Sequence, residues 1–566
     1  MKEIFLAEYG ILPGMDIWKR LNALFSESNT DTVFHFAPGE YHLHSASAAP
    51  FSVSLSNSDQ LPVFKAGLKL DHMRSIKITG HGAKLLCHGQ LSPIAIMDCT
   101  NITIEDLTID FTPTHNAEGV ILQATQEWAD VAVDTTKYTY MIQDERLFFW
   151  NGETFAPTFG AIEFDAATLR TAYRAGDRFR SKRQEEISQG VLRFHGKFDP
   201  LPTPGNYITL RFSPRTHPGI LVHHCEDVAL SGITLHNTCG LGVLSQFSRD
   251  LRYTRITMRQ NHEQGRRVVS CHDDGLHFSN NCGKITVEDC FFHGLMDDPV
   301  NVHGTALRIK TITGKRSLAA EFVHPQSTAF PYWAGAGDEV SFIEHKAMNS
   351  IGTLKAERYS LLSGNDCEVT FDSDLPAQLK PGDALENLSN TPQVEIRGCH
   401  FGSCRARGVL VSTPRKVVIE NNVFESSGSA ILIAGDANYW FETGACRDVV
   451  IRKNVFTEHC LTSMYQFCEG VISICPEIPA PKRDKPFHEN IRIEDNTFHA
   501  FDAPLLYALS VNGLTFQNNT VQRSHAHAPW HPRKAMATLK ACTGAQISGN
   551  LFSGDVLSTE VALEAF

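Results

Sequence analysis

Short runs in which apolar and polar residues alternate recur along this chain, and five of the eight runs named below end in an asparagine with an apolar or aromatic residue one or two positions later. Alternation with a period of two predicts half-buried strands, because neighbouring side chains of a strand point to opposite faces. Lys416 follows Gln393 by about 23 residues and Gly513 follows Asn490 by the same step, whereas larger steps indicate the same coil with a longer loop. A fixed step of roughly 20 to 50 residues predicts stacked coils. The pattern therefore predicts an all-β protein built on a right-handed parallel β-helix. The runs begin at Asn101, Lys284, Gln393, Lys416, Asp448, Asn490, Gly513 and Ala545.

Four cysteines each stand three residues before the first apolar position of a strand run: Cys99, Cys225, Cys282 and Cys446. A small, weakly polar side chain suits the narrow interior of a solenoid, so we expect these thiols to be structural. Zinc binding is the alternative, but the chain has no C-x-x-C motif and no Cys-His spacing typical of zinc sites. The fifteen cysteines, an odd number, favour reduced thiols over a disulfide framework. We expect no metal and no cofactor.

The asparagine-ended runs stop twice along the chain, and both interruptions have the same character. Each alternates like antiparallel strands and closes with a Pro-Gly turn that leads into a final strand. We expect two related small antiparallel β-barrel modules, inserted between coils, that wall a cleft or make a subunit contact. The predicted divisions are coils at 1–115, a module at 116–213, coils at 214–304, a module at 305–388 and coils at 389–566.

The N-terminal residues combine a helical pattern with a start unlike that of an exported protein. Apolar residues at Ile17, Leu21, Leu24 and Phe25 predict a helix that covers the first coil and protects its edge. The segment MKEIFLAEYGILPG carries Glu3 and only a short apolar run, unlike a signal peptide, and no apolar run reaches the roughly 18 residues of a membrane span. We expect a cytoplasmic protein with no membrane contact, or a secreted or periplasmic one if a leader has been removed.

Two aspartate pairs, Asp273-Asp274 in CHDDGLHFSNN and Asp297-Asp298 in GLMDDPVNVHG, are separated by about one repeat. Either pair alone is consistent with a turn, but one coil apart in a solenoid they lie one above the other, so four carboxyls are expected to converge. Stacked like charges destabilise a fold unless a ligand or a shared proton offsets them. Proteins keep such clusters mainly where one carboxyl is protonated and another ionised, as glycoside hydrolysis requires.

The geometry of the predicted carboxyl cluster has two open points. In a regular strand, only one residue of each aspartate pair points outward. Adjacent coils also permit either the roughly 5 Å carboxyl separation of retaining glycosidases or the roughly 6.5 to 9.5 Å separation of inverting ones. The spacing in the sequence therefore leaves the stereochemistry undecided.

Other candidate binding residues lie in the same stretch and in a later loop. We expect His272 and His303 to bind sugar hydroxyls or to tune a carboxyl, because they flank the aspartates. In the loop GDANYWFETGA, Trp440 is suited to lie under the apolar face of a sugar, although packing beneath its own loop is the commoner arrangement. The histidines of the stretch are His262, His272, His277, His293 and His303.

The net charge narrows the choice of partner. The formal charge of −12 is spread along the chain without a basic stripe, which argues against nucleic acid and against polyanionic glycans and favours a neutral glycan. Two rival functions stay open. The first is a polysaccharide lyase, which uses Lys or Arg as its base, usually with Ca²⁺; no basic residue adjoins the aspartates in the sequence, which argues against it. The second is a non-catalytic glycan-binding solenoid, in which stacked aspartates would have no role.

Four strings of the chain resemble the motifs of glycoside hydrolase family 110, bacterial exo-acting α-1,3-galactosidases: DDGLHFSNN, LMDDPVNVHG, RARGVLVSTPRKVVIENNVF and GDANYWFETG. The resemblance runs from the N-terminal EYGILPG segment to the later coils. It implies a parallel β-helix with two inserted β-barrels and no metal. The implied activity is inverting removal of terminal α-1,3-linked galactose, as from blood-group-B-type or linear α-galactosyl glycans. The family also resembles polygalacturonases in fold and in using three aspartates.

The resemblance implies roles for individual residues. Asp297 would be the general acid, and Asp274 and Asp298 would position and deprotonate the attacking water. Asp273 would support the substrate site, and a homodimer through an inserted module is possible for this fold. Family members are usually exported, so the missing leader leaves the physiological glycan open. The expected substrate-binding residues are His272, His303, Asp273, Arg407, Asp436 and Trp440.

Overall fold

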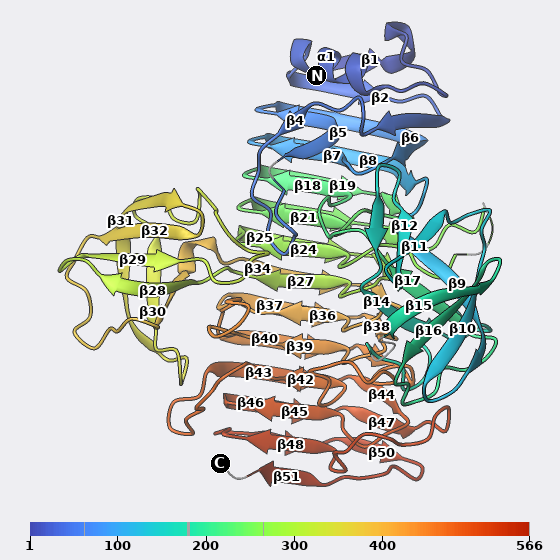
Figure 1. The fold of residues 1–566 in the computed structure, drawn as a ribbon. Helices are drawn as coiled ribbons and strands as arrows, with labels where there is room; N and C mark the ends of the chain where they lie inside the picture. Colours follow the sequence, from blue (N-terminus) through green and yellow to red (C-terminus); the bar gives the residue numbers. More distant parts are fainter. Residues whose placement is uncertain (62, 178–180, 264, 266, 565–566) are drawn as a thin grey trace.

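The computed structural model describes residues 1–61, 63–177, 181–263, 265 and 267–564. The chain forms one stack of β-coils, with helix α1 (Trp18–Glu27) and strand β1 (Lys2–Phe5) at one end and strand β51 (Val561–Glu564) at the other (Figure 1). Two β-modules project from opposite sides of the stack. The predicted parallel β-helix with two inserted modules is confirmed.

Parallel strand pairs in three columns form the walls of the solenoid, and the columns belong to a 23-stranded and a 13-stranded sheet. The first column consists of β1, β2 (Thr30–His35), β6 (Arg74–His88), β8 (Thr100–Phe111), β19 (Glu226–Ser231), β22 (Arg249–Thr254), β25 (Cys282–Glu288), β34 (Gln393–Arg397), β37 (Lys416–Glu420), β40 (Asp448–Arg452), β43 (His488–Glu494), β46 (Val511–Gln517) and β49 (Gln546–Ser548).

The second column shares the long strands β6 and β8 with the first. Its other members are β3 (Glu40–His44), β20 (Thr234–Leu235), β23 (Thr257–Met258), β26 (Phe291–Phe292), β35 (His400–Phe401), β38 (Val423–Phe424), β41 (Val455–Phe456), β44 (Thr497–Ala500), β47 (Thr520–Arg523) and β50 (Leu551–Ser553).

The third column forms the 13-stranded sheet and carries the candidate site. It begins with β4 (Pro50–Phe51), paired antiparallel to β5, and continues with parallel pairs through β51. Its strands are β5 (Phe64–Asp71), β7 (Ser92–Met97), β18 (Ile220–His223), β21 (Val243–Gln246), β24 (Leu276–Ser279), β27 (Val300–His303), β36 (Val409–Val411), β39 (Ile431–Ile433), β42 (Ile472–Ile474), β45 (Leu506–Leu509) and β48 (Ala537–Lys540).

The asparagine that ends each of the five runs from Lys416 onward has a specific role inside the turn between the first two columns. The side-chain amide and the backbone amide of Asn454 both donate to Oδ1 of Asn496 at 3.0 Å, and the same pattern repeats from coil to coil. A buried backbone amide without such an acceptor is costly, so the ladder stabilises each turn. The ladder consists of Asn422, Asn454, Asn496, Asn519 and Asn550.

The predicted column of cysteines is confirmed for Cys99 and Cys225 but not for Cys282. The backbone amide of Cys99 donates to Sγ of Cys225 at 3.4 Å, so these two thiols stack in the interior as predicted. The prediction is wrong for Cys282, which is half-buried, because the register shifts by one residue between β22 and β25. Asn281 takes its place in the column and accepts from the amide of Ser248 at 2.8 Å. All fifteen cysteines are free thiols.

The first inserted module contains a six-stranded antiparallel sheet, in the order β14-β17-β9-β10-β16-β15, and a three-stranded sheet, β11-β12-β13. These strands enclose their own apolar core, which includes Phe149 and Phe212. The strands are β9 (Asn116–Ala124), β10 (Trp128–Val133), β11 (Tyr140–Gln143), β12 (Arg146–Trp150), β13 (Phe155–Pro157), β14 (Gly160–Phe164), β15 (Ser181–Ser188), β16 (Val191–Gly196) and β17 (Tyr207–Arg211).

The second inserted module is a closed antiparallel barrel, in the order β28-β29-β32-β31-β30-β33, around a core that includes the fully buried Trp333. Its strands are β28 (Leu307–Ile312), β29 (Ser317–Glu321), β30 (Glu339–Ile343), β31 (Ser350–Ser363), β32 (Asp366–Phe371) and β33 (Ala384–Asn387).

Helices are few and short. Besides α1, the described residues contain the 3-10 helices η1 (Leu6–Tyr9) and η2 (Leu388–Asn390). The predicted N-terminal helix is confirmed as α1, which buries Leu21, Leu24 and Phe25 at the start of the stack. In the described residues, no helix has the length and apolar character needed to cross a membrane.

Candidate active site

Three charged residues hold the same position in three successive coils. Asp274, Asp298 and Arg407 each stand two residues before a strand of the third column, namely β24, β27 and β36. These strands pair in register, so the three side chains follow one another along the stack. The expected separation of the aspartate pairs by one coil is therefore confirmed.

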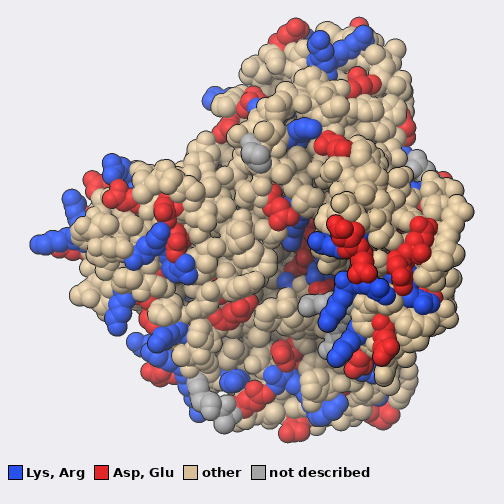
Figure 2. Space-filling model, in the orientation of Figure 1, with Lys and Arg blue, Asp and Glu red and all other residues tan. Residues whose placement is uncertain are grey.

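The three predicted catalytic aspartates, Asp274, Asp297 and Asp298, line one cavity of about 100 Å³. Acidic and basic side chains gather around a hollow near the middle of the face that lies between the two modules (Figure 2). The other polar or aromatic residues that line the cavity include Asn57, Arg215, Asn301, Arg407, Asp436, Trp440, Glu442, Tyr465, Gln466 and Glu477.

The expectation that one member of each aspartate pair faces outward holds for the first pair only. Asp274 lines the cavity, whereas Asp273 is 0% exposed and lies behind it. Asp297 and Asp298 both line the cavity. Alternation fails there because this pair lies in the bend before β27, not in the strand itself. Three carboxyls thus share the cavity, with the fourth buried beside them.

Asp273 and Asp274 are held in the charged form by cationic partners. Nη2 of Arg211 donates to Asp273 at 2.6 Å, and Nη2 of Arg215 donates to Asp274 at 2.9 Å. His277 adds an Nδ1 contact of 2.6 Å to the other oxygen of Asp274. Burial opposes ionisation of both carboxyls, but the Arg215 charge and the histidine hydrogen bonds outweigh it and lower both pKa values.

Asp297 and Asp298 differ in how well the protein supports their charge. Asp298 accepts hydrogen bonds from the backbone amide of Arg407 at 2.8 Å and from its Nη2 at 2.7 Å. Asp297 has longer contacts, 3.3 Å to Nη1 of Arg405 and 3.8 Å to Nη1 of Arg215, and its side chain is 16% exposed.

Both of these carboxyls resist ionisation. Burial raises the pKa of Asp298 to about 7, although Arg407 opposes the shift, and burial followed by the charge of Asp274 raises the pKa of Asp297. The two neighbours therefore compete for one proton. Because the short hydrogen bonds from Arg407 stabilise the carboxylate of Asp298, the proton is better held by Asp297.

Basic residues do adjoin the aspartates in the folded chain, so the prediction that none would do so is wrong. Arg215 lies 59 residues before Asp274, and Arg405 lies 108 residues after Asp297. Arg215 and Asp274 belong to the same set of coils, whereas the second inserted module separates Arg405 from Asp297 along the chain; the stacking of coils brings both arginines to the aspartates. Sequence adjacency therefore gave no signal for Arg211 and Arg215, whereas Arg405 and Arg407 belong to the RARG string.

The prediction of direct sugar contact does not hold for His272 and His303, which are 0% and 1% exposed and lie outside the cavity lining. Other protein groups already occupy their ring nitrogens. His272 contacts Asp273 at 2.7 Å and the carbonyl of Phe212 at 2.8 Å. His303 contacts Nε2 of His277 at 2.9 Å. Both histidines thus support the carboxyl cluster from behind.

The aromatic loop lies at the cavity, as the position of Trp440 in its lining indicates. The indole of Trp440 is half-buried and stacks on the ring of His324 at a centroid distance of 3.7 Å. Asp436 also reaches the cavity, but its carboxylate accepts backbone hydrogen bonds from Asn438 to Phe441 and so shapes the loop. Sugar binding by Arg407, Asp436 and Trp440 stays a prediction.

Several residues of the cavity had no signal in the sequence. Glu442 accepts a hydrogen bond from Nδ2 of Asn57 at 2.6 Å, which connects the N-terminal coils to the loop. Burial, followed by the charge of Asp436, raises the pKa of Glu477 to about 7. The Tyr465 ring lies under the guanidinium of Arg407 at 5.1 Å. These groups come from distant segments, so only the fold brings them together.

Among the residues that the structure describes, two groups of side chains elsewhere have the donor spacing of a metal site, Asp71 with His72 and Asp98, and Glu344 with His345 and Asp383. None of these residues lines the cavity that holds Asp274, Asp297 and Asp298. Acidic and histidine groups of this kind are common at protein surfaces without an ion. They give the candidate site no metal ligand.

Family models match three parts of the chain. The GLAA-B beta-barrel domain I matches residues 117–208, and the GLAA-B beta-barrel domain II matches residues 317–385. A model of the right-handed beta helix region matches residues 383–552. These matches agree with the two modules and the coils of the structure.

Similar proteins cover the whole chain. Alpha-1,3-galactosidase B of Bacteroides thetaiotaomicron is 40% identical over 100% of this chain and 93% of its own. Alpha-1,3-galactosidase A of Bacteroides fragilis is 35% identical over 88% of this chain and 82% of its own. Among solved structures, the family 28 exopolygalacturonase of Yersinia enterocolitica aligns over 98% of this chain and 78% of its own, with 11% identity and a TM-score of 0.38.

Proposed function

This chain belongs to the α-1,3-galactosidase family, and from that premise we propose that it is an exo-acting glycoside hydrolase that removes terminal α-1,3-linked galactose from glycans with inversion. The observation that carries the proposal is the unequal support of three carboxyls at one cavity. Arg215 and Arg407 stabilise the charged forms of Asp274 and Asp298, whereas Asp297 has longer contacts and holds a proton more readily. Acid and base are thus present together.

In the proposed reaction, Asp297 gives its proton to the glycosidic oxygen as the bond to the anomeric carbon breaks. Asp274 and Asp298 hold a water on the opposite face of the sugar, and one of them takes its proton as the water attacks. The products are β-galactose and the shortened glycan. In each turnover Asp297 loses one proton and the base gains one, and exchange with solvent returns both carboxyls to their starting forms.

The form of the cavity supports exo action on a neutral sugar. A volume of about 100 Å³ suits one terminal residue better than the middle of a long chain. Its lining carboxyls outnumber the two arginines Arg215 and Arg407, which disfavours uronates and sulfated sugars. A lyase acting on uronates is therefore not favoured, even though arginines adjoin the aspartates.

Linear and fucosylated B-type α-1,3-galactosides are the candidate glycans. A homodimer through an inserted module and a cytoplasmic location stay predictions.

The test is hydrolysis of galactosyl-α-1,3-galactose in EDTA, followed by NMR of the released anomeric proton at early times. The proposal expects β-galactose first, without added metal. Initial α-galactose would overturn inversion while keeping the hydrolase. No release from this disaccharide and none from the fucosylated B trisaccharide would overturn the galactosidase function, and a Ca²⁺-dependent unsaturated product from a uronate polymer would replace it with a lyase.

A further inference from the structure

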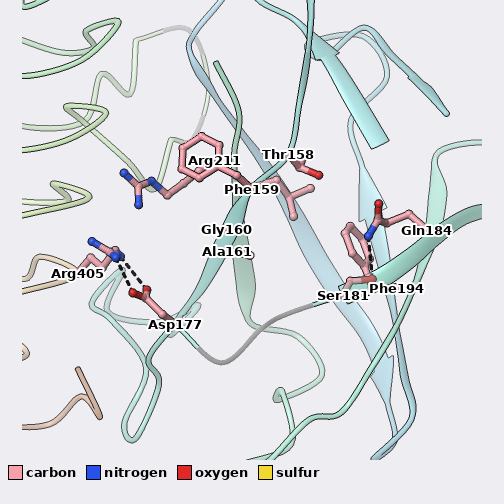
Figure 3. Close-up of a pocket in the computed structure, with 11 residues that line it drawn as sticks. Thr158, Phe159, Gly160, Ala161, Asp177, Ser181, Gln184, Phe194, Arg211 and Arg405 are labelled. Carbon is pink, nitrogen blue, oxygen red and sulfur yellow. Dashed lines mark hydrogen bonds and ion pairs between the residues drawn. The ribbon is translucent and has the colours of Figure 1, made fainter. Parts of the chain in front are cut away.

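We infer that the cavity between the first inserted module and the coils binds the leaving part of the glycan, as neutral sugar residues next to the galactose that is cut off; this inference rests on the proposed galactosidase function. The cavity has a volume of about 470 Å³ and is distinct from the one that holds the three aspartates. Figure 3 shows its wall, with Arg405 and Asp177 on one side and Gln184 and Ser181 on the other.

Arg405 connects the two cavities. Its Nη1 lies 3.3 Å from Asp297, and its Nε donates to Asp177 at 2.8 Å. The guanidinium lines the larger cavity, while Asp297 lines the smaller one. A general acid contacts the glycosidic oxygen, so the leaving sugar must extend from the acid away from the galactose. The larger cavity adjoins Asp297 through the Arg405 side chain, and we therefore place the leaving sugar there.

Arg211 provides a second connection. Its Nη2 donates to Asp273 at 2.6 Å, and the residue also lines the larger cavity. Asp273 lies behind Asp274, so the wall of the larger cavity is connected by ion pairs to the carboxyl cluster at two points, Arg211 and Arg405.

The remaining wall suits an uncharged carbohydrate. Phe159 is 57% exposed despite its size, and its ring lies 5.0 Å from the guanidinium carbon of Arg211. An exposed aromatic ring on a cavity wall can pack against the apolar face of a sugar. Thr158, Ser181 and Gln184 offer neutral polar groups. Both arginines are already paired with carboxylates, which favours a neutral ligand over an anion.

The size and shape of the larger cavity also fit a bound sugar. Its volume lies within the roughly 300 to 1,000 Å³ of typical ligand pockets. Gly160 opens into this space, because a Cβ added there would meet only Cδ of Arg211, at 3.9 Å. A larger side chain at position 160 would therefore occupy the cavity without displacing the backbone.

The test compares two substrates that share the galactose and differ in the leaving group. One is a linear trisaccharide with a terminal galactosyl-α-1,3-galactose, and the other is α-galactosyl fluoride, whose leaving group is a fluoride ion. We expect Phe159→Ala to lower kcat/KM for the trisaccharide about threefold to tenfold more than for the fluoride. Gly160→Leu should block the cavity and give a difference of about tenfold or more.

The control is Leu122→Ala, which changes an exposed side chain of the same module outside the cavity and should leave both substrates unaffected. Turnover of the fluoride by each variant reports that the variant is folded. Equal losses on the two substrates, or no loss on either, would overturn the inference while leaving the galactosidase intact. Failure of the unaltered protein to cleave either substrate would instead overturn the proposed function.

Discussion

Asp274 and Asp298 hold the same position in two successive coils, and the amide of Gly275 donates to the carbonyl of Asp298 at 2.9 Å. Carboxylates one strand spacing apart, roughly 4.8 Å, repel unless each has its own counter-charge. Arg215 supplies the counter-charge for Asp274, and Arg407 supplies the counter-charge for Asp298. Asp297 has only the longer contacts, so the cluster separates two charged carboxyls from one that can hold a proton.

Asp297→Asn tests this division, because asparagine keeps the shape of the side chain and cannot donate a proton to a leaving oxygen. We expect kcat/KM for galactosyl-α-1,3-galactose to fall about 10²- to 10⁴-fold. Hydrolysis of α-galactosyl fluoride should fall far less, since fluoride leaves without protonation. Steady-state kinetics on both substrates provide the measurement. An Asn variant that still cleaves the natural disaccharide at the original rate would remove Asp297 from the role of acid.

Much of the fold follows from the sequence because its elements repeat. The period-two runs and their terminal asparagines predict the coils, and the structure gives the reason: the side chain of Asn454, for example, accepts from the backbone amide of Asn422 and donates to the carbonyl of Ile419 in the preceding coil. Cys282 shows the limit. A one-residue register shift between β22 and β25 moves it out of the column, and nothing in the local pattern predicts that shift.

The candidate site follows from the sequence only where one repeat separates the residues. Asp274 and Asp298 are such a pair. The arginines that balance them lie far away in the sequence: Arg215 is 59 residues before Asp274, and Arg407 follows Asp298 only after the second inserted module, so both contacts depend on how the coils stack. The position of His272 beside the aspartates in sequence predicts that it binds the sugar or tunes a carboxyl; its ring nitrogens contact Asp273 and a backbone carbonyl, which agrees with the second of these roles.

A buried chain of hydrogen bonds lies behind Asp274. Nδ1 of His277 lies 2.6 Å from the Asp274 carboxylate, and Nε2 of His277 lies 2.9 Å from Nε2 of His303. Nδ1 of His303 lies 3.1 Å from the carbonyl of Gly304. Burial lowers the pKa of His303, which favours its neutral form. His277 thus connects Asp274 to a second buried histidine.

His277→Phe removes the hydrogen bond that lowers the pKa of Asp274 and the contact with His303. Loss of a hydrogen bond to a charged group costs about 1.5 to 3 kcal/mol, so we expect kcat to fall about tenfold to hundredfold. The pKa of Asp274 should rise, which moves the acidic limb of the kcat/KM profile to higher pH. A merely structural loss would lower the rate without moving this limb. His236→Phe, at a half-buried histidine outside the cavity, is the matched control.

Asn496→Ala tests the asparagine ladder. The change leaves the backbone amide and Nδ2 of Asn454 without their shared acceptor and frees the carbonyls of Ile451 and Glu494. Unsatisfied buried groups of this kind cost about 1 to 3 kcal/mol each, so we expect the free energy of unfolding to fall by about 2 to 4 kcal/mol. Urea titration followed by circular dichroism measures the loss. Asn512→Ala, at an exposed asparagine, should change it little, and equal stability of the two variants would contradict the role of the ladder.

Asp177→Asn tests whether the first inserted module sets the proton affinity of the acid. Asp177 pairs with Arg405, and Arg405 in turn contacts Asp297. Burial and the charge of Asp274 raise the pKa of Asp297, and Arg405 opposes that shift. Without Asp177, the charge of Arg405 is less compensated and stabilises the Asp297 carboxylate more strongly. The charged and titratable groups that act on Asp297 are Arg215, Arg405, Arg407, Asp274, Asp298 and Tyr465.

The sign of the effect follows from the acid role, since Asp297 works only while protonated. A lower pKa means that its proton is lost at a lower pH, so the basic limb of kcat/KM for the disaccharide should move to lower pH, by up to about one unit. The acidic limb, which reports the base, should stay in place. With α-galactosyl fluoride the shift should vanish, because that substrate does not need the proton. A basic limb that stays fixed, or moves to higher pH, would show that Asp177 does not act on Asp297 through Arg405.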